Sequence, residues 1–503
     1  MQEYIPENHI ARTVNRIIGR LDITSLIHSY DPEGAPAYHP RMMLKVLIYG
    51  MLIGIRSSRK IEALLKDSLV FMYLSGRQGP DFRTICRFRR RHLGEITGIF
   101  DQVVELCVEL GMVAGKDVFC DGTKVKANAA VKHSKTKKQI KKEIKKLKKE
   151  VRKMLKEAEN TDEKEDSLFG NSNPYTGEGK KSTLLTRIER LEQAYEEISE
   201  DDETVTPDGD TTSPDEEKEE TKNEETEENE TKIKKGKGKE KEKKINITDF
   251  DANIMQFSDK TLRPAYNGEV AVNGKENVIV ACHLIDEATD HNQLQPLLEH
   301  SQDNGVHPDN AVADASFYSH DNAHYLEEKG ITGYIPDNFF AKEEKKKTKK
   351  FRKSQFCYDE ETDSFTCPEG HTLPFHHIQT RKDAPDLKIY KGTDCPDCPL
   401  KEKCTKAQYR TVSRDPRDYL KEEMRSQLRT EKGKRLKKER STKVESVFGN
   451  MKQNKKFTQF LLRGKQGAAI EFVLMCIALN IEKIFMHAAT YRDDVVTVMQ
   501  GIT

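Results

Sequence analysis

The chain has 503 residues, of which 35% are hydrophobic and 34% are charged. A chain of this length can form two or three domains, but so large a charged fraction means that part of it lies outside any core. Lysine and arginine (85) almost balance aspartate and glutamate (84). The balanced total hides segregated charge, because residues 137–153 and 232–244 are basic and residues 215–230 are acidic.

Several classes of protein are excluded by what the sequence lacks. No run of about 18 apolar residues is present, so we expect no transmembrane helix and no membrane partner. The N-terminal MQEYIPENHI has neither the basic start nor the apolar core of a signal peptide. Ten cysteines in so long a chain, without a secretory signal, favour reduced thiols or a metal site over a disulfide scaffold. Together these features predict a cytoplasmic protein.

Residues 1–115 are predicted to form a helical domain. Apolar residues recur at three- and four-residue spacing in the segments 41–54, 60–74 and 95–111. Between the last two segments lies DFRTICRFRRRH, residues 81–92, in which arginines are concentrated. We expect an anionic partner to bind the protein here.

The arginine-rich segment has two faces if it is helical. Four arginines fall on one arc, namely Arg83, Arg87, Arg90 and Arg91, and three apolar residues fall on the other, namely Phe82, Ile85 and Phe88. One interpretation is a solvated face of an ordinary bundle helix. The other is a face that contacts phosphates, whose geometry arginine suits.

A mixed α/β domain is predicted after the helical region, from residues 116–130, 246–345 and 430–490. Strands are expected at 116–126, 265–286 (a hairpin around NGKEN), 310–316 and 330–337, with helices between them and at 442–457 and 467–485. Two insertions interrupt this domain. Residues 131–245 are charged, in part helical and in part disordered, without an expected catalytic role, and residues 346–429 are rich in cysteine.

Two of the predicted strands end in an aspartate, VFCD at Asp121 and AVAD at Asp314. Ligand sites of open α/β sheets lie outside strand ends, and two carboxylates placed there repel each other unless a cation lies between them. A hard divalent ion such as Mg²⁺ prefers these oxygen ligands. Because nothing obvious in the neighbouring sequence neutralises Asp121, we expect a metal ion to compensate it.

A third acid is required to hold two metal ions, and the predicted helix 442–457 offers Glu445. Glu445 and Lys452 are seven residues apart and so lie on nearly the same helical face, where the acid could face metal and the amine a phosphate. The apolar side of this helix consists of Val444, Val447, Phe448 and Met451. The alternative is a surface Glu–Lys pair two turns apart.

Three segments together resemble a known family. DGTKVKANA (121–129), VADASFYS (312–319) and RSTKVESVFGNMK (440–452) are similar to the active-site segments of bacterial insertion-sequence transposases of the DDE superfamily, which have an RNase H-like catalytic core. The helical N-terminal region and the closing helix also resemble that group. The resemblance covers nearly the whole chain outside about 131–245.

The resemblance implies roles for particular residues. Asp121, Asp314 and Glu445 match the first, second and third catalytic acids, which would ligate two Mg²⁺ or Mn²⁺ ions. Arg440 and Lys452 match basic positions of the glutamate motif, whereas Lys437 stands where that motif has a tyrosine. The residues expected to bind DNA are these two, Lys124, and the four arginines Arg83, Arg87, Arg90 and Arg91.

The activity that the resemblance implies is cleavage at insertion-sequence ends and transfer of the 3′-ends into target DNA. Double-stranded DNA, as terminal inverted repeats and as target, would be the partner, and a homo-oligomer is expected to assemble on the DNA ends. Without the resemblance, the residues alone predict only a metal-dependent reaction at a phosphodiester. Two alternatives remain open: a catalytically idle DNA-binding relative, and a nuclease that cuts without strand transfer.

The cysteine-rich insertion contains CPEGH (367–371) and CPDCPLKEKC (395–404). Its four thiols, Cys367, Cys395, Cys398 and Cys404, suit tetrahedral Zn²⁺, with His371 as a substitute ligand. Unliganded reduced thiols and redox chemistry are the alternatives. Such a zinc ion would be structural, because four protein ligands leave no open coordination position.

Overall fold

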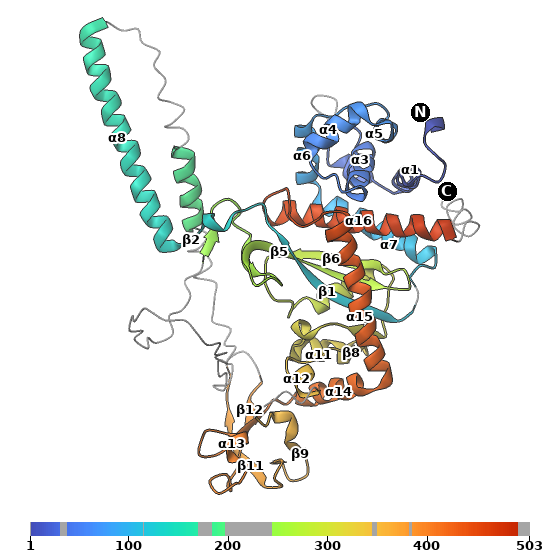
Figure 1. The fold of residues 1–503 in the computed structure, drawn as a ribbon, viewed down its shortest axis with the longest axis vertical. Helices are drawn as coiled ribbons and strands as arrows, with labels where there is room; N and C mark the ends of the chain where they lie inside the picture. Colours follow the sequence, from blue (N-terminus) through green and yellow to red (C-terminus); the bar gives the residue numbers. More distant parts are fainter. Residues whose placement is uncertain are drawn as a thin grey trace, which may run out of the picture. The chain divides into compact units, whose positions relative to one another are not determined.

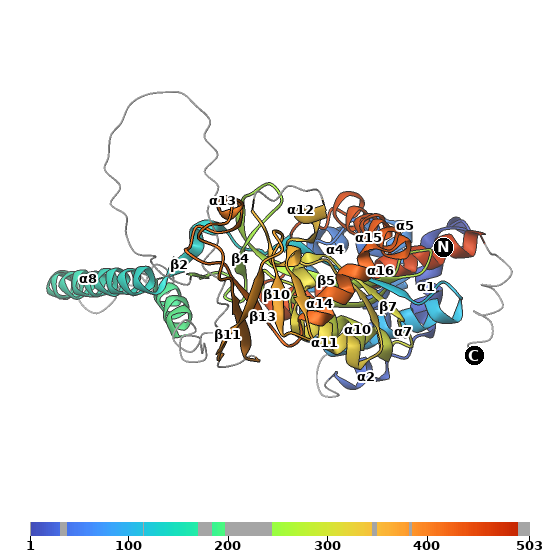
Figure 2. The same cartoon turned by 90° about the horizontal axis from the view of Figure 1, so that it is seen from below.

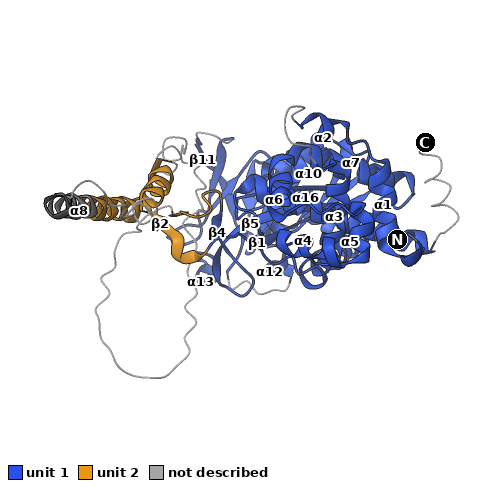
Figure 3. Ribbon diagram, turned by 90° about the horizontal axis from the view of Figure 1, so that it is seen from above, with its two compact units in different colours: residues 1–129, 252–503 blue, residues 130–251 orange. Residues whose placement is uncertain are grey.

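The chain divides into two compact units in a computed structural model, residues 1–129 with 252–503, and residues 130–251 (Figure 3). The described residues are 2–30, 38–113, 115–169, 184–196, 244–344, 350–381 and 385–490. The acidic stretch 215–230 and nearly all of the basic stretch 232–244 lie outside them.

The N-terminal region is helical, as its periodicity predicts. Its helices are α1 (Ile10–Arg20), α2 (Thr24–His28), α3 (Pro40–Leu52), α4 (Ser58–Asp67), α5 (Leu69–Ser75), α6 (Phe82–Arg91) and α7 (Leu93–Glu109). Local signals set where they begin: Pro40 opens α3, and the Asp81 side chain accepts a hydrogen bond from the backbone N–H of Thr84 at the start of α6. Helix α3 is buried almost all round, which explains its uniformly apolar sequence.

A mixed sheet follows the helices in the larger unit. Its strands are β1 (Asp117–Lys126), β4 (Asn253–Gln256), β5 (Leu262–Asn273), β6 (Val278–Ile285), β7 (Asn310–Val312) and β8 (Thr332–Tyr334). The hydrogen-bonded order is β4-β5-β1-β7-β8, and β6 pairs with β5. Strand β1 is antiparallel to β5 and parallel to β7, and β7 is parallel to β8.

The predicted alternation of strands and helices is confirmed. Helix α10 (Leu294–Asp303) separates β6 from β7, and α11 (His320–Glu328) separates β7 from β8. The short strand β4 was not predicted. It pairs with the first residues of β5, and β6 pairs with the rest of β5.

The C-terminal part contributes α14 (Asp418–Arg429), α15 (Glu431–Gly449), a π-helical turn (Asn450–Asn454) and α16 (Lys465–Thr490). Figure 1 shows α16 between the sheet and the N-terminal helices, where it packs against β5, β6, α3 and α7. Gly268 in β5 permits this close approach, because a Cβ atom there would lie 2.4 Å from the ring of Phe472. None of the described helices is long and apolar enough to cross a membrane.

Glu471 of α16 has a fully buried side chain that joins three separate segments. Its carboxylate lies 3.6 Å from the Arg56 guanidinium and 3.7 Å from that of Arg89 in α6. It also accepts hydrogen bonds from the backbone N–H groups of Leu461 (3.0 Å) and Leu462 (2.9 Å). A buried charge is tolerated only with such partners, so these contacts depend on one another.

The smaller unit has a core of its own. Helix α8 (Lys137–Phe169) and the helical segment 184–196 pack together beside the two-stranded pair β2 (Ser134–Thr136) and β3 (Lys244–Asn246). The buried residues are Ile140, Leu147, Val151, Ile188, Leu191, Ala194 and Ile245. The described part of the insertion is thus helical, as predicted, and carries an apolar stripe among its lysines.

The cysteine-rich insertion forms a second sheet, which the sequence did not predict. The strands are β9 (Cys357–Asp359), β10 (Ser364–Thr366), β11 (Thr372–Gln379), β12 (Leu387–Lys391) and β13 (Thr411–Arg414), with the short helix α13 (Lys401–Cys404). They pair in the antiparallel order β13-β12-β11-β10-β9. Figure 2 shows three of them, β10, β11 and β13, from below. Most of these strands are short, and many of their residues are exposed. Their sequences are therefore too short to show the alternation of apolar and polar residues that reveals a strand.

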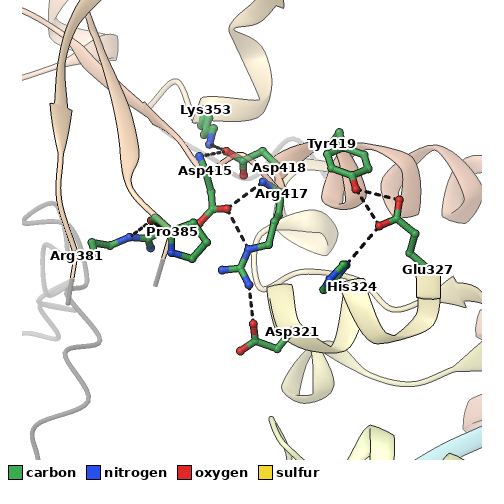
Figure 4. A network of polar contacts seen from close by, with 10 residues as sticks. All are labelled: Asp321, His324, Glu327, Lys353, Arg381, Pro385, Asp415, Arg417, Asp418 and Tyr419. Carbon is green, nitrogen blue, oxygen red and sulfur yellow. Dashed lines mark hydrogen bonds and ion pairs between the residues drawn. The ribbon is translucent and has the colours of Figure 1, made fainter. Parts of the chain in front are cut away.

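Polar contacts connect this second sheet to the rest of the larger unit (Figure 4). Arg417 bridges Asp415, which follows β13, and Asp321 in α11, at 3.2 Å and 2.6 Å. Asp415 also pairs with Arg381, which follows β11, at 2.5 Å. Lys353 pairs with Asp418 at the start of α14. These ion pairs fix the insertion where the chain leaves and re-enters the sheet domain.

We predict that Glu471→Gln lowers the free energy of unfolding by about 3–5 kcal/mol, because it leaves Arg56 and Arg89 buried without a counter-charge. Urea-induced unfolding followed by far-UV circular dichroism measures the change. Glu431→Gln is the control, since Glu431 pairs with Lys434 on the exposed surface of α15. Equal shifts in the two variants would contradict the structural role assigned to Glu471.

Candidate active site

Asp121 lies in the middle of β1, so the prediction that it ends a strand was wrong. Strand β1 continues to Lys126 because β5 pairs with it along residues 118–126. On its other side β7 pairs only with residues 117–119. Asp121 therefore follows the point at which parallel pairing stops, although its own strand goes on.

Asp314 follows β7, the strand next to β1, by two residues, so the strand predicted at 310–316 ends earlier, at Val312, and Asp314 begins a turn. The parallel pairing joins Asp117 to Asn310 and Phe119 to Val312. Asp121 and Asp314 each lie two residues beyond the last paired residues, and the Asp314 carboxylate is close enough to raise the pKa of Asp121. The Asp314 carboxylate accepts a hydrogen bond from the backbone N–H of Ser316 at 2.8 Å and so caps the 3₁₀ turn Ala315–Phe317. This local bond fixes the direction of the carboxylate.

Arg440 of α15 neutralises Asp121, so the expectation that only a metal would compensate this acid was wrong. One guanidinium nitrogen lies 2.8 Å from an Asp121 oxygen, and the two side chains are 16% and 20% exposed. Burial raises the pKa of Asp121 to about 6, against the opposing effect of Arg440, and the Asp314 carboxylate adds to the rise. The sequence could not reveal this pair, because its members are 319 positions apart (440 − 121).

Two further carboxylates belong to the same cluster and were missed by sequence reasoning. Glu269 of β5 is fully buried opposite Gly122, and a Cβ atom on Gly122 would lie 2.7 Å from a Glu269 oxygen. Burial raises the pKa of Glu269 well above its ordinary value, and Asp290, Asp121 and Asp314 add to the rise. Neither Glu269 oxygen has a hydrogen-bond partner of good geometry among the described residues.

The second of these further carboxylates is Asp290, and Ser316 links it to Asp314. Its hydroxyl lies 2.5 Å from an Asp290 oxygen and also contacts an Asp314 oxygen. Asn267 donates from its side-chain amide to the other Asp290 oxygen at 2.5 Å. One hydroxyl proton serves only one of the two carboxylates at a time. The sequence signal that could have identified Glu269 is a single acid inside the apolar strand AYNGEVAVN.

Glu445 lies on α15, the helix that packs against β1, β7 and β8. The third acid was expected on a helix of this kind, packed across the strand ends. Its side chain is exposed, whereas Val444, Val447 and Met451 are buried, which confirms most of the predicted apolar face. Phe448 is partly buried. No ion pair or hydrogen bond of the Glu445 side chain occurs among the residues that the structure describes.

Lys452 and Lys124 interact near Asp121. The Lys452 amine donates to the backbone carbonyl of Lys124 at 3.1 Å, and burial lowers its pKa although Asp121 opposes the change. The Lys124 amine donates to the Gln256 carbonyl at 3.3 Å. Lys452 lies in the π-helical turn Asn450–Asn454, so the expectation of one α-helix through residue 457 was wrong.

The four predicted arginines of α6 are exposed together. Arg83, Arg87, Arg90 and Arg91 face solvent, while Ile85 and Phe88 are buried, as the helical projection predicts. Phe82 is half-buried under the Arg59 guanidinium, 4.7 Å from its ring centre. Arg89 differs from its neighbours, because it is buried against Glu471 and donates to Ser58 at 2.6 Å.

The four predicted cysteines, Cys367, Cys395, Cys398 and Cys404, line a common cavity in the second sheet. Across the described part of the chain, no three histidine, cysteine or acidic side chains already lie at metal-binding distances from one another.

At the carboxylate cluster around Asp121, the chemistry of the oxygen donors nevertheless fits a divalent cation. The Asp314 carboxylate opposes ionisation of Asp121, and both acids oppose ionisation of the fully buried Glu269, whose oxygens have no hydrogen bond of good geometry among the described residues.

Comparison with protein families gives two matches. A family described as "Transposase domain (DUF772)" matches residues 1–91, and one described as "Transposase DDE domain" matches residues 366–485. The two matches indicate an insertion-sequence transposase of the DDE type. The comparisons with curated proteins and with solved structures gave no match.

The matched ranges cover different parts of the chain. Residues 1–91 include the arginine face of α6, and residues 366–485 include Arg440, Glu445, Lys452 and the four cysteines. Asp121 and Asp314 lie between the two ranges. Their pairing with the Glu445 helix therefore rests on the sheet register and on the Arg440 contact.

We predict that Arg440→Gln destabilises the protein in the presence of chelator and at low salt, since Asp121 and Asp314 then lie near each other without a neutralising cation. In the Asp121→Asn background the same change should cost much less, with a coupling of about 0.5–3 kcal/mol from a double-mutant cycle of thermal unfolding. The matched control is Arg435 with Glu439, an exposed pair on the same helix, for which about 0.5 kcal/mol or less is expected. Equal coupling energies in both cycles would show that the Asp121–Arg440 pair contributes no more to stability than an exposed surface ion pair.

Proposed function

We propose that the chain cleaves DNA at insertion-sequence ends and joins the released 3′-ends to target DNA, with Asp121, Asp314 and Glu445 as catalytic acids. The observation that carries the proposal is the parallel pairing of β1 with β7 up to Phe119 and Val312: Asp121 and Asp314 each follow the last paired residue by two positions, and α15, which bears Glu445, packs against both strands. The two family matches support a transposase function in general. The mixed sheet and its helices support an RNase H-like core.

The three acids would hold two Mg²⁺ or Mn²⁺ ions. Bound there, such ions supply an activated attacking oxygen and neutralise charge on the leaving oxygen of a phosphodiester. The chain itself supplies the acidic cluster and its restraint. Ser316 orients Asp314, and the backbone N–H of Gly122 donates to Asp121 at 3.0 Å.

Basic residues beside the acids would position the DNA. The Arg440 guanidinium already binds one carboxylate, and its planar donors suit a phosphate equally well. Lys452 adds a partly buried amine on the same side of Asp121. The exposed arginines of α6 would contact the DNA backbone outside the active site.

A second candidate function is a nuclease that cuts without strand transfer, because the same acids serve both reactions. An assay on DNA that carries the element's own ends distinguishes the two. Joined products in addition to cleaved ends support the transposase, and cleaved ends alone support the nuclease.

We predict that Asp121→Asn, Asp314→Asn and Glu445→Gln each abolish divalent-metal-dependent cleavage while DNA affinity stays close to that of the wild type. Each change keeps the shape of the side chain and removes a charge that would bind metal. Cleavage of labelled terminal DNA with Mg²⁺ or Mn²⁺, and a parallel binding titration, measure both properties.

The controls for these variants are Asp309→Asn, near β7, and Glu439→Gln, on α15, because both acids are partly exposed and paired with surface cations. Both controls should cleave normally. Normal cleavage by any one of the three acid variants shows that this acid has been misassigned. Glu445→Gln is the most stringent of the three tests, because the Glu445 side chain is exposed.

We predict that Arg87→Ala with Arg90→Ala weakens binding to all duplex sequences alike. The slope of log affinity against log salt should become shallower by about 0.9 for each lost phosphate contact. Arg87→Lys with Arg90→Lys is the matched control, because it keeps the charge and should keep the slope. A slope that stays the same in the folded alanine variant would identify this face as a solvated bundle surface.

A further inference from the structure

Four cysteines from three separate segments meet at one cavity of the second sheet. Cys367 follows β10, Cys395 and Cys398 lie in the loop after β12, and Cys404 ends α13. All four line a cavity of about 30 Å³, together with Phe356, Leu373 and several polar or charged residues that include His371 and Arg410. A volume of this size holds one water-sized body. We propose that these four cysteines bind a single structural zinc ion.

The local backbone is arranged around the sulfur atoms. The N–H of His371 donates to the Cys367 sulfur, and the N–H of Arg410 donates to the Cys395 sulfur, both at 3.3 Å. Hydrogen bonds of this kind orient thiolate ligands and stabilise their charge. Gly392 leaves room for one sulfur, because a Cβ atom there would lie 2.7 Å from Cys395 Sγ.

The chemistry of the four groups favours zinc over other occupants. All four cysteines are free thiols, and two of them have the C-x-x-C spacing of a zinc knuckle. Soft thiolate ligands in a tetrahedral set select zinc over the hard ions that the carboxylate site suits. Among the described residues, no three of these side chains already lie at metal-binding distances from one another, so the sulfur atoms must rotate inward to bind an ion. The backbone segments that carry them already line the same cavity.

The second sheet also has a physical need for such an ion. Its core consists of five buried side chains, Phe356, Phe365, Leu373, Tyr390 and Val412. Domains with so small a core usually depend on a metal or on disulfides. Strand β11 adds little, because its residues from Pro374 to Gln379 are exposed. Cys367 and Cys404 pack against this core, so a zinc ion would extend it directly.

His371 and Cys357 provide matched controls within the same sheet. The His371 ring lies 3.3 Å from an Asp394 carboxylate oxygen at the rim of the cavity, so its removal should leave four thiolate ligands in place. Cys357 in β9 is an exposed thiol of the same sheet, outside the residues that line the cavity.

The test measures zinc in the full-length protein, purified without chelators, by elemental mass spectrometry. One zinc per chain is expected, and Cys395→Ser and Cys398→Ser should each lose most of it, whereas Cys357→Ser and His371→Ala should retain it. Cobalt added to the zinc-depleted wild type should give thiolate-to-metal charge-transfer absorption. The intensity should indicate four thiolates.

The wild-type measurements keep the proposal testable even if a serine variant fails to fold. A zinc-free protein that gives no cobalt absorption after reduction would overturn the proposal. So would a disulfide among the four cysteines in freshly purified protein, detected by peptide mass spectrometry, because it would assign them to redox chemistry. Loss of zinc from His371→Ala but retention in Cys404→Ser would replace the fourth ligand and overturn the four-cysteine assignment.

Discussion

The buried carboxylate of Glu471 is the interaction on which the arrangement of the larger unit depends. It compensates Arg56 and Arg89 from the N-terminal helices and caps two backbone N–H groups before α16. Helix α16 in turn packs on β5 and β6, through a contact that Gly268 makes possible. Because a buried charge without its partners is costly, this network holds the arginine face of α6 in a fixed relation to the sheet that carries Asp121.

Within that frame, the site follows from a difference in pairing along β1. Its antiparallel partner continues to residue 126, whereas its parallel partner stops at residue 119. The strand therefore remains extended past Asp121 while the neighbouring chain turns away at Asp314, and the two carboxylates are left at one edge. Burial and mutual repulsion are then unavoidable, and they appear as a raised pKa of Asp121 that Arg440 only partly opposes.

Short-range patterns predicted most of the elements, and long-range contacts account for what they missed. The periodicities of α3, α7, α16 and the β5–β6 hairpin are long enough to recognise, and the motifs placed Asp121 and Asp314 on adjacent strands. The end of a strand, by contrast, depends on its partners, so the interpretation of Asp121 as a strand end failed. The Arg440 pair and the π-helical turn before Lys455 are likewise set by packing between distant segments, whereas Glu269 had a local signal, a single acid inside an apolar strand.

The Arg440 pair also changes what metal binding at this site would involve. A cation that approaches Asp121 meets a carboxylate already neutralised by a guanidinium at 2.8 Å, so binding is an exchange of one positive partner for another. Arg440 would then lose its carboxylate while it remained beside the acids, on a helix fixed against β1. Loss of its anion is unfavourable for a partly buried guanidinium, and under the proposed function a DNA phosphate would take the place of that anion. Under the proposed function, Arg440 would be available to a DNA phosphate when Asp121 held a cation, and Asp121 would be available to a cation when Arg440 held a phosphate, so each ligand would favour binding of the other.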